Sequence, residues 1–172
     1  MIELPEQNPC EFCEGFAGRD PTWAVIDECV STVTVLNPFQ YETGQCCVIT
    51  KRHVGTLLEL NNVEAKAIIK AAQRVAMALV SKYQPLGVLT FQNNGVYSGQ
   101  EVPHYHFHVV PRQQGSDWGI GPPQLAVFDG VGRERGTTHN TSGDAERRRR
   151  VQVPAEVLQR TAAAIRAHLP ER

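Results

Sequence analysis

Three histidines alternate with apolar residues in the segment His104-Tyr105-His106-Phe107-His108. Successive side chains of a β-strand point to opposite faces, so the spacing predicts three imidazoles on one face and an apolar, core-facing row on the other. A buried imidazole needs polar partners, and the packing of a sheet does not require three of them. The row therefore indicates chemistry.

Two chemistries fit this row. His104 and His106 could bind a metal ion together with a distant carboxylate, as in metal-dependent hydrolases. Alternatively, an imidazole that holds one nitrogen as a donor has a lone pair on the other, which can attack phosphorus and form a covalent phospho-histidine. His108 could then bind the phosphoryl oxygens or protonate the leaving group. The residue types alone leave both open.

The loop before the histidines contains amides and glycines, among them Asn93, Gly99 and Gln100. Glycine permits backbone turns that bring N–H groups close to a ligand, and amide side chains are neutral donors. We expect this loop to offer donors to a phosphate group.

A Cys-X-X-Cys pair, Cys10 and Cys13, lies near the N-terminus. This spacing suits one tetrahedral zinc, which needs two further ligands, although a redox pair is the alternative. Cys46 and Cys47 are adjacent and would point to opposite faces of a strand, so they cannot chelate together. We interpret them, with Cys29, as packing residues and expect histidines to complete the site.

The elements that must position these residues follow from hydrophobic periodicity and turn signals. A helix over residues 61–83 begins with an N-cap Asn and carries one apolar stripe, and Pro85 ends it. Strands are expected at 22–26, 30–36, 45–50, 86–91 and 105–110. The order predicts an α+β fold: five strands in meander order, mostly antiparallel, with one long helix.

Composition limits the class of protein. The chain has 172 residues, of which 41% are hydrophobic and 20% charged, as in a folded soluble domain. It has no apolar stretch of bilayer-spanning length, and its N-terminus lacks a secretory signal, so we expect a cytoplasmic protein that does not bind membranes.

The C-terminal part differs from the rest. We predict a catalytic domain over 1–122 and an extension over 123–172, with a mobile loop (Gly130–Gly143), the run Arg147–Arg150 and a terminal helix over 154–169. Residues 133–172 carry nine arginines and five acidic residues, a net +4, whereas residues 1–132 carry −5. Any nucleic-acid contact should therefore involve the arginine run, although a solvated basic stretch is more common.

The segment Gly99-Gln-Glu-Val-Pro-His-Tyr-His-Phe-His-Val-Val110 resembles the signature of the histidine-triad (HIT) family of nucleotide hydrolases and transferases. The resemblance covers roughly residues 10–112. It implies a five-stranded antiparallel sheet with the long helix packed on it, and a two-fold homodimer.

By the same resemblance, the substrate is a nucleoside monophosphoryl group, usually AMP, joined to a leaving group. His106 would be the nucleophile, oriented by the carbonyl of His104, and His108 would contact the phosphoryl oxygens and assist the leaving group. The implied nucleotide-binding residues are Asn37 for the ribose and Asn93, Gly99 and Gln100 for the phosphate. Two residues depart from the family: Glu101 stands where many members have Ser or Thr, and Gln45 where some have His.

The zinc-containing branch of the family combines a Cys-X-X-Cys pair, a downstream His and the first His of the triad. Its pattern implies a closed structural zinc site formed by Cys10, Cys13, His53 and His104. Besides the metal-dependent hydrolase, two rival functions stay open. One is a nucleotide-binding module without turnover, and the other is an enzyme that removes 5′-AMP from nucleic-acid ends.

Overall fold

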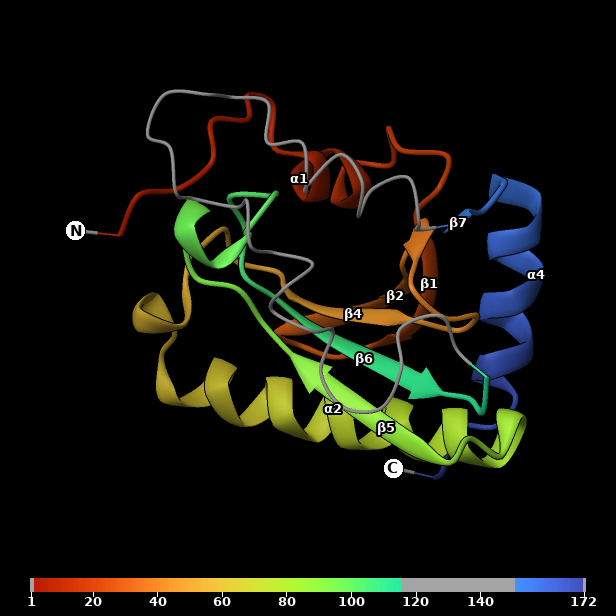
Figure 1. Cartoon of the computed structure of the whole chain (residues 1–172). Helices are drawn as coiled ribbons and strands as arrows, with labels where there is room; N and C mark the ends of the chain where they lie inside the picture. The colour runs from red at the N-terminus through yellow and green to blue at the C-terminus, as the bar shows by residue number, and fades with distance from the viewer. Residues whose placement is uncertain (1, 116–150, 172) are drawn as a thin grey trace.

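A central antiparallel sheet organises the protein in the computed structural model, which describes residues 2–115 and 151–171 (Figure 1). Its order is β1 (Ala24–Glu28), β2 (Thr32–Leu36), β4 (Cys46–Thr50), β6 (His106–Arg112) and β5 (Gly87–Phe91). The predicted α+β class and all five strands are confirmed.

The expected meander order is wrong at the last two strands. After β4 the chain crosses one face of the sheet as the 22-residue helix α2 (Asn62–Tyr83) and returns at the edge as β5. Both β4 and β5 are antiparallel to β6, so they run in the same direction and cannot form a hairpin with each other. The last strand, β6, fills the position between them and places the histidines near the centre of the sheet.

Helix α2 matches its prediction closely because local signals define both ends. The side chain of Asn61 accepts from the backbone N–H groups of Val63 and Glu64, and the carboxylate of Glu64 accepts in turn from the backbone N–H of Asn61. This reciprocal cap satisfies donors that the first turn leaves unpaired. The helix ends at Gln84, which adopts the left-handed conformation with φ of 48°.

The remaining elements surround the sheet. They are α1 (Glu11–Phe16), the 3-10 turns η1 (Leu57–Glu59) and η2 (Val96–Ser98), the small pair β3 (Phe39–Gln40) and β7 (Val151–Gln152), and α4 (Ala155–Arg166). Among the described residues, no helix combines the length and the hydropathy needed to cross a bilayer.

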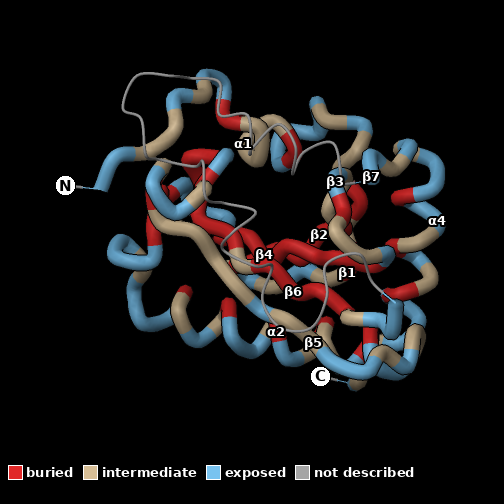
Figure 2. Tube along the Cα trace, viewed as in Figure 1, coloured by how far each residue is buried: buried red, intermediate tan, exposed pale blue. Residues whose placement is uncertain are grey.

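Both faces of the sheet are covered, which is why its central strands are buried throughout (Figure 2). On one face, Cys46, Val48 and Val109 pack with the apolar stripe of α2. On the other face, Val33, Val35, Cys47 and Ile49 pack with Phe12 and Trp23 at α1. The histidines of β6 lie on this second face, beneath α1.

Helix α4 is part of the main core. Leu158, Ala162 and Ile165 are fully buried in the same cluster as the stripe of α2. Arg166 donates to the backbone carbonyls of Val25 and Ile26 on edge strand β1, which occupies acceptors that another strand could otherwise pair with. The terminal helix is thus confirmed, and it adds to the core of the predicted catalytic domain.

We expect Ile165→Ala to lower the free energy of unfolding by about 2–5 kcal/mol, because it leaves a cavity in this shared core. Val157→Ala, on the exposed side of the same helix, should change it by no more than about 0.5 kcal/mol. Urea denaturation of both variants measures the difference. Equal stabilities would show that α4 does not pack in the core.

Several predictions concern residues outside the described ranges. They are the mobile loop predicted at Gly130–Gly143 and the arginine run Arg147–Arg150. The nucleic-acid contact predicted for that run therefore also lies outside the described residues. The domain boundary at 122/123 falls in the same gap and stays a prediction.

Candidate active site and metal centre

Two of the three predicted histidines lie on β6 and point to the face covered by α1. In the register of β6 with β4, His106 pairs with Ile49 and His108 with Cys47. Tyr105 and Val109 are buried in the core on the opposite face, and Phe107, between the two histidines of β6, packs against the same cluster. The predicted alternation is confirmed, and His104 lies just before the strand begins.

The ring of His106 is held by its own strand. Its Nδ1 donates to the carbonyl oxygen of His104 at 2.8 Å, which is the orienting contact that the family resemblance implies. The edge of the ring contacts Phe12 of α1, with the centroids 5.1 Å apart. Burial lowers the pKa of His106, so the ring is neutral at neutral pH. With the proton on Nδ1, the lone pair is on Nε2.

His108 is fixed by three neighbours: one in β5, one in β4 and one just before β4. Its ring stacks on Phe91 of β5 at 4.4 Å, and its Nδ1 lies 3.2 Å from Nε2 of Gln45 and 3.3 Å from Sγ of Cys47. The sequence singled out Gln45 only as a departure from the family and interpreted Cys47 as packing. Strand register brings both to His108, and no local pattern encodes that register.

The loop predicted to bind phosphate, residues 93–100, is held by hydrogen bonds from its own side chains. The buried Gln100 accepts from the backbone N–H of Gly95 at 2.6 Å and donates to the carbonyls of Gly55 and Val102. Both amide hydrogens of Gln100 are therefore engaged in holding the loop. Asn93 donates to the carbonyl of Gly99, whose φ of 81° favours glycine. Their contacts with phosphate stay predictions.

Asn37, the predicted ribose ligand, lies close to the histidine row. Its Oδ1 accepts from the backbone N–H of Phe39 at 2.9 Å, and its Nδ2 donates to Sγ of Cys47 at 3.5 Å. Cys47 in turn contacts His108. Asn37 is therefore linked to His108 through Cys47, and its contact with a ribose stays a prediction.

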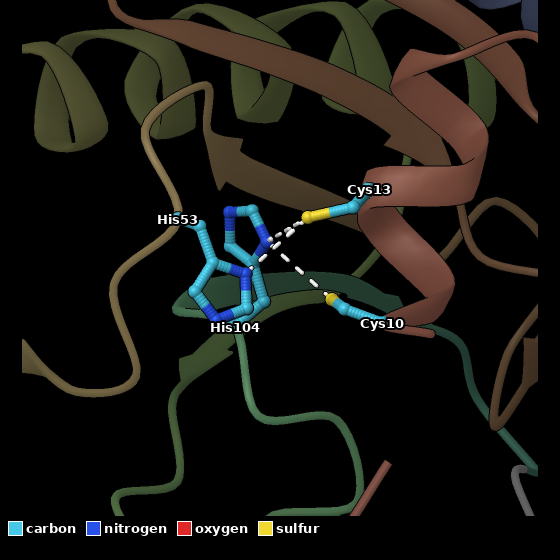
Figure 3. Close-up of side chains that lie close together, drawn as sticks. All are labelled: Cys10, Cys13, His53 and His104. Atoms are coloured by element: carbon cyan, nitrogen blue, oxygen red, sulfur yellow. Dashed lines mark hydrogen bonds between the residues drawn. The ribbon is translucent and has the colours of Figure 1, made fainter. Parts of the chain in front are cut away.

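The four predicted metal ligands converge although they lie up to 94 positions apart (Figure 3). Nδ1 of His104 lies 3.7 Å from Sγ of Cys10 and 3.8 Å from Sγ of Cys13, and Nδ1 of His53 lies 3.3 Å from Sγ of Cys13. A tetrahedral zinc with Zn–S of about 2.3 Å and Zn–N of about 2.1 Å places its ligands roughly 3.4–3.8 Å apart. The donor set and its spacing fit zinc.

The protonation states of the ligands agree with this fit. Burial lowers the pKa of His104 to about 4, and its Nε2 lies 2.7 Å from the carbonyl of Thr50, so Nδ1 presents a lone pair to the cluster. Burial and the neighbouring Cys10 raise the pKa of Cys13 to about 11, so a cation is needed to hold its thiolate at neutral pH. Helix α1, which contains Cys13 and has Cys10 as its N-cap residue, was not predicted.

The same contacts argue against a metal ion shared by His104 and His106. Nε2 of His104 is bonded to Thr50, and its Nδ1 faces the two cysteines. Nδ1 of His106 is occupied by the carbonyl of His104. His104 thus has no nitrogen left for a hydrolytic metal site with its neighbour.

Carboxylates lie near the site. Glu101 is exposed, and its charge acts on the nucleophile candidate by raising the pKa of His106 against the larger effect of burial. Burial raises the pKa of Glu11 on α1, and the charges of Asp20 and Glu101 add to that shift. The charge of Glu101 thus acts on both His106 and Glu11, and its effect on an anionic substrate stays a prediction.

Comparison with known proteins agrees with the fold and the histidine row. The family model of the HIT domain matches residues 24–115. "Protein hit" of Bacillus subtilis is 34% identical over 103 residues, which cover 60% of this chain and 70% of that protein. The adenosine 5′-monophosphoramidase hnt1 of Schizosaccharomyces pombe is 28% identical over 112 residues, covering 65% and 80%.

Among solved structures, a zinc-bound histidine triad family protein from Mycobacterium smegmatis superimposes with a TM-score of 0.61 at 22% identity, covering 92% of this chain and 96% of that one. The sheet, the long helix and the histidine row define a histidine-triad protein. The chain belongs to the HIT family. This is a family of nucleotide-binding proteins and hydrolases.

Proposed function

We propose that the protein hydrolyses or transfers the nucleotidyl group of AMP-type substrates, such as adenosine phosphoramidates or dinucleoside polyphosphates, through a covalent intermediate on His106. The observation that carries the proposal is the hydrogen bond from Nδ1 of His106 to the carbonyl of His104. It fixes the tautomer in which Nε2 is a nucleophile, and burial keeps the ring uncharged.

In the first step, Nε2 of His106 forms a bond to the α-phosphorus, and the bond from phosphorus to the leaving group breaks. The leaving group departs with the bonding electron pair and takes a proton from solvent. In the second step, water or another acceptor attacks phosphorus and loses a proton, the P–N bond breaks, and neutral His106 is restored. Hydrolysis thus releases AMP and the protonated leaving group.

We propose that Cys10, Cys13, His53 and His104 hold one structural zinc ion. Four protein ligands leave no open position for a substrate or a reactive water, so the chemistry the ion supplies is charge neutralisation of the thiolates and a rigid cross-link. His104 belongs both to this cluster and, through its carbonyl, to the support of His106. The cluster thereby positions the proposed nucleophile.

The proposed function is tested by mixing the protein with a generic AMP-amide and following AMP release by mass spectrometry. Turnover, together with an adenylyl adduct on a His106 peptide after rapid acid quench, is expected. Binding of AMP without turnover across a panel of adenylylated compounds would instead assign a nucleotide-binding module. Turnover without an adduct on His106 would contradict the covalent mechanism.

Glu101→Gln should tighten AMP binding about two- to threefold at low ionic strength, because two unit charges 6–8 Å apart in a water-like dielectric interact by about 0.5–0.7 kcal/mol. The gain should shrink as salt is added. Titration calorimetry at two salt concentrations measures it, with Glu156→Gln on α4 as the control for loss of one negative charge. If both variants bind AMP with the same affinity, Glu101 does not repel the nucleotide.

The homodimer implied by the family is also a proposal for this chain. Strand β5 is an edge of the sheet, and Ile69, Met77 and Val80 of α2 are exposed although apolar. A second copy pairing at this edge would extend the sheet and cover apolar surface. Light scattering should give twice the mass of the 19.1 kDa chain, and the mass of a single chain would contradict the proposal.

A further inference from the structure

The Nδ1 atom of His108 faces two polar groups in a buried pocket. Nε2 of Gln45 lies 3.2 Å away and Sγ of Cys47 lies 3.3 Å away. Gln45 is fully buried, Cys47 is 3% exposed and His108 is 9% exposed. Both contacts lie where little water reaches, so they bear directly on whether Nδ1 carries a proton.

The orientation of the Gln45 amide is fixed by its other end. The oxygen Oε1 accepts the backbone N–H of Tyr41 at 2.8 Å. A backbone N–H can only donate, so the atom that meets it must be the oxygen, and the atom that faces His108 must be the NH₂ group. Because an amide NH₂ only donates, Nδ1 of His108 must be the acceptor.

Cys47 is compatible with the same assignment. Asn37 donates its amide hydrogen to the sulfur, so the sulfur is an acceptor on that side and its own S–H is available to Nδ1 of His108. Burial raises the pKa of Cys47 to about 12, so the thiol keeps its hydrogen. The thiol can therefore donate to Nδ1 alongside the amide of Gln45, which can only donate.

We propose that Gln45 and Cys47 hold His108 as a neutral imidazole with its proton on Nε2. A second proton on Nδ1 would point at the amide N–H and the thiol, so the imidazolium form is disfavoured. The groups that face the ring from the neighbouring strands are Cys47 of β4, Phe91 of β5 and His106 of β6, and the first two are uncharged at neutral pH. The neutral form of His106, at 4.8 Å between ring centroids, adds no charge either.

This assignment selects between the two roles that the sequence left open for His108. The role of His108 toward a substrate rests on the proposed function. In that role, the Nε2–H of His108 donates a hydrogen bond to a phosphoryl oxygen. A neutral imidazole is a very weak acid, so His108 is not the proton source for the leaving group. Gln45 and Cys47 are positioning residues, since they act on the substrate only through His108.

The test is a two-bond ¹H–¹⁵N spectrum of the zinc-loaded, ¹⁵N-labelled wild-type protein without substrate, between about pH 5.5 and 8, the range where an ordinary histidine titrates. A His108→Gln variant identifies the signals. The expected result is the pattern of a neutral Nε2–H tautomer at every pH. A pattern with the proton on Nδ1, or conversion of His108 to the imidazolium in this range, would overturn the proposal.

Two variants test the part played by Gln45. In Gln45→Glu, the carboxylate can accept a hydrogen bond, so Nδ1 should gain a proton and His108 should become charged at pH 7. In Gln45→Met, which has similar size but no polar group, His108 should titrate within the range. An unchanged His108 pattern in both folded variants would show that Gln45 does not set the tautomer. The spectra need no turnover, so this outcome is independent of the proposed function.

Discussion

Replacement of His106 by asparagine is expected to abolish turnover of an AMP-amide while AMP still binds. Asparagine can keep a donor near the carbonyl of His104 but has no nucleophilic nitrogen to form the P–N bond. Removing the nucleophile of an enzyme that works through a covalent intermediate costs on the order of 10⁴-fold or more in kcat. Steady-state kinetics measure the loss, and titration calorimetry with AMP measures the binding that remains.

The matched control is His168→Asn. His168 bonds to Ser81 on the exposed side of the molecule and has no part in the proposed site, so its turnover should equal that of the wild type. The adenylyl adduct should disappear from His106→Asn and persist in the control. Residual turnover of His106→Asn above about one hundredth of the wild-type kcat would count decisively against the covalent mechanism.

Removal of the metal should lower the stability of the folded protein substantially. A ligand held at about 1,000 times its Kd stabilises the folded state by about 4 kcal/mol. In a chain of this size, each kcal/mol corresponds to about 2–4 °C in Tm, so chelation should lower Tm by roughly 8–16 °C. Calorimetry with and without a strong chelator measures the shift, and elemental analysis should find one zinc ion per chain.

Two cysteine variants separate the cluster from general effects of losing a thiol. Cys13→Ser removes a ligand and should lose both the zinc and most of the stabilisation. Cys29→Ser can keep the hydrogen bond to Thr32 and lies outside the cluster, so its zinc content and Tm should match the wild type. Equal zinc content in both variants, or a Tm that chelation does not change, would contradict the assignment.

Local patterns in the sequence determined the chemical groups and the elements that carry them. The alternation around His106 placed the imidazoles and the core-facing Tyr105 on opposite faces, because side chains of a strand alternate over two residues. The cap at Asn61 and the apolar stripe defined α2 through contacts three and four residues apart. Such features depend on neighbours in the chain and can therefore be predicted from sequence.

Only the tertiary structure decided how distant segments meet. The insertion of β6 between β4 and β5 set the strand order, and its register placed Cys47 opposite His108. The unpredicted helix α1, with Cys13 in its first turn and Cys10 at its N-cap, brings both cysteines to His104, more than ninety residues away in sequence. Register and docking depend on burying whole faces of the sheet against α1, α2 and α4, a balance of many non-local contacts. The sequence and its family resemblance therefore supplied a candidate nucleophile and a candidate set of metal ligands, whereas the fold alone revealed the contacts of His108 with Gln45 and Cys47.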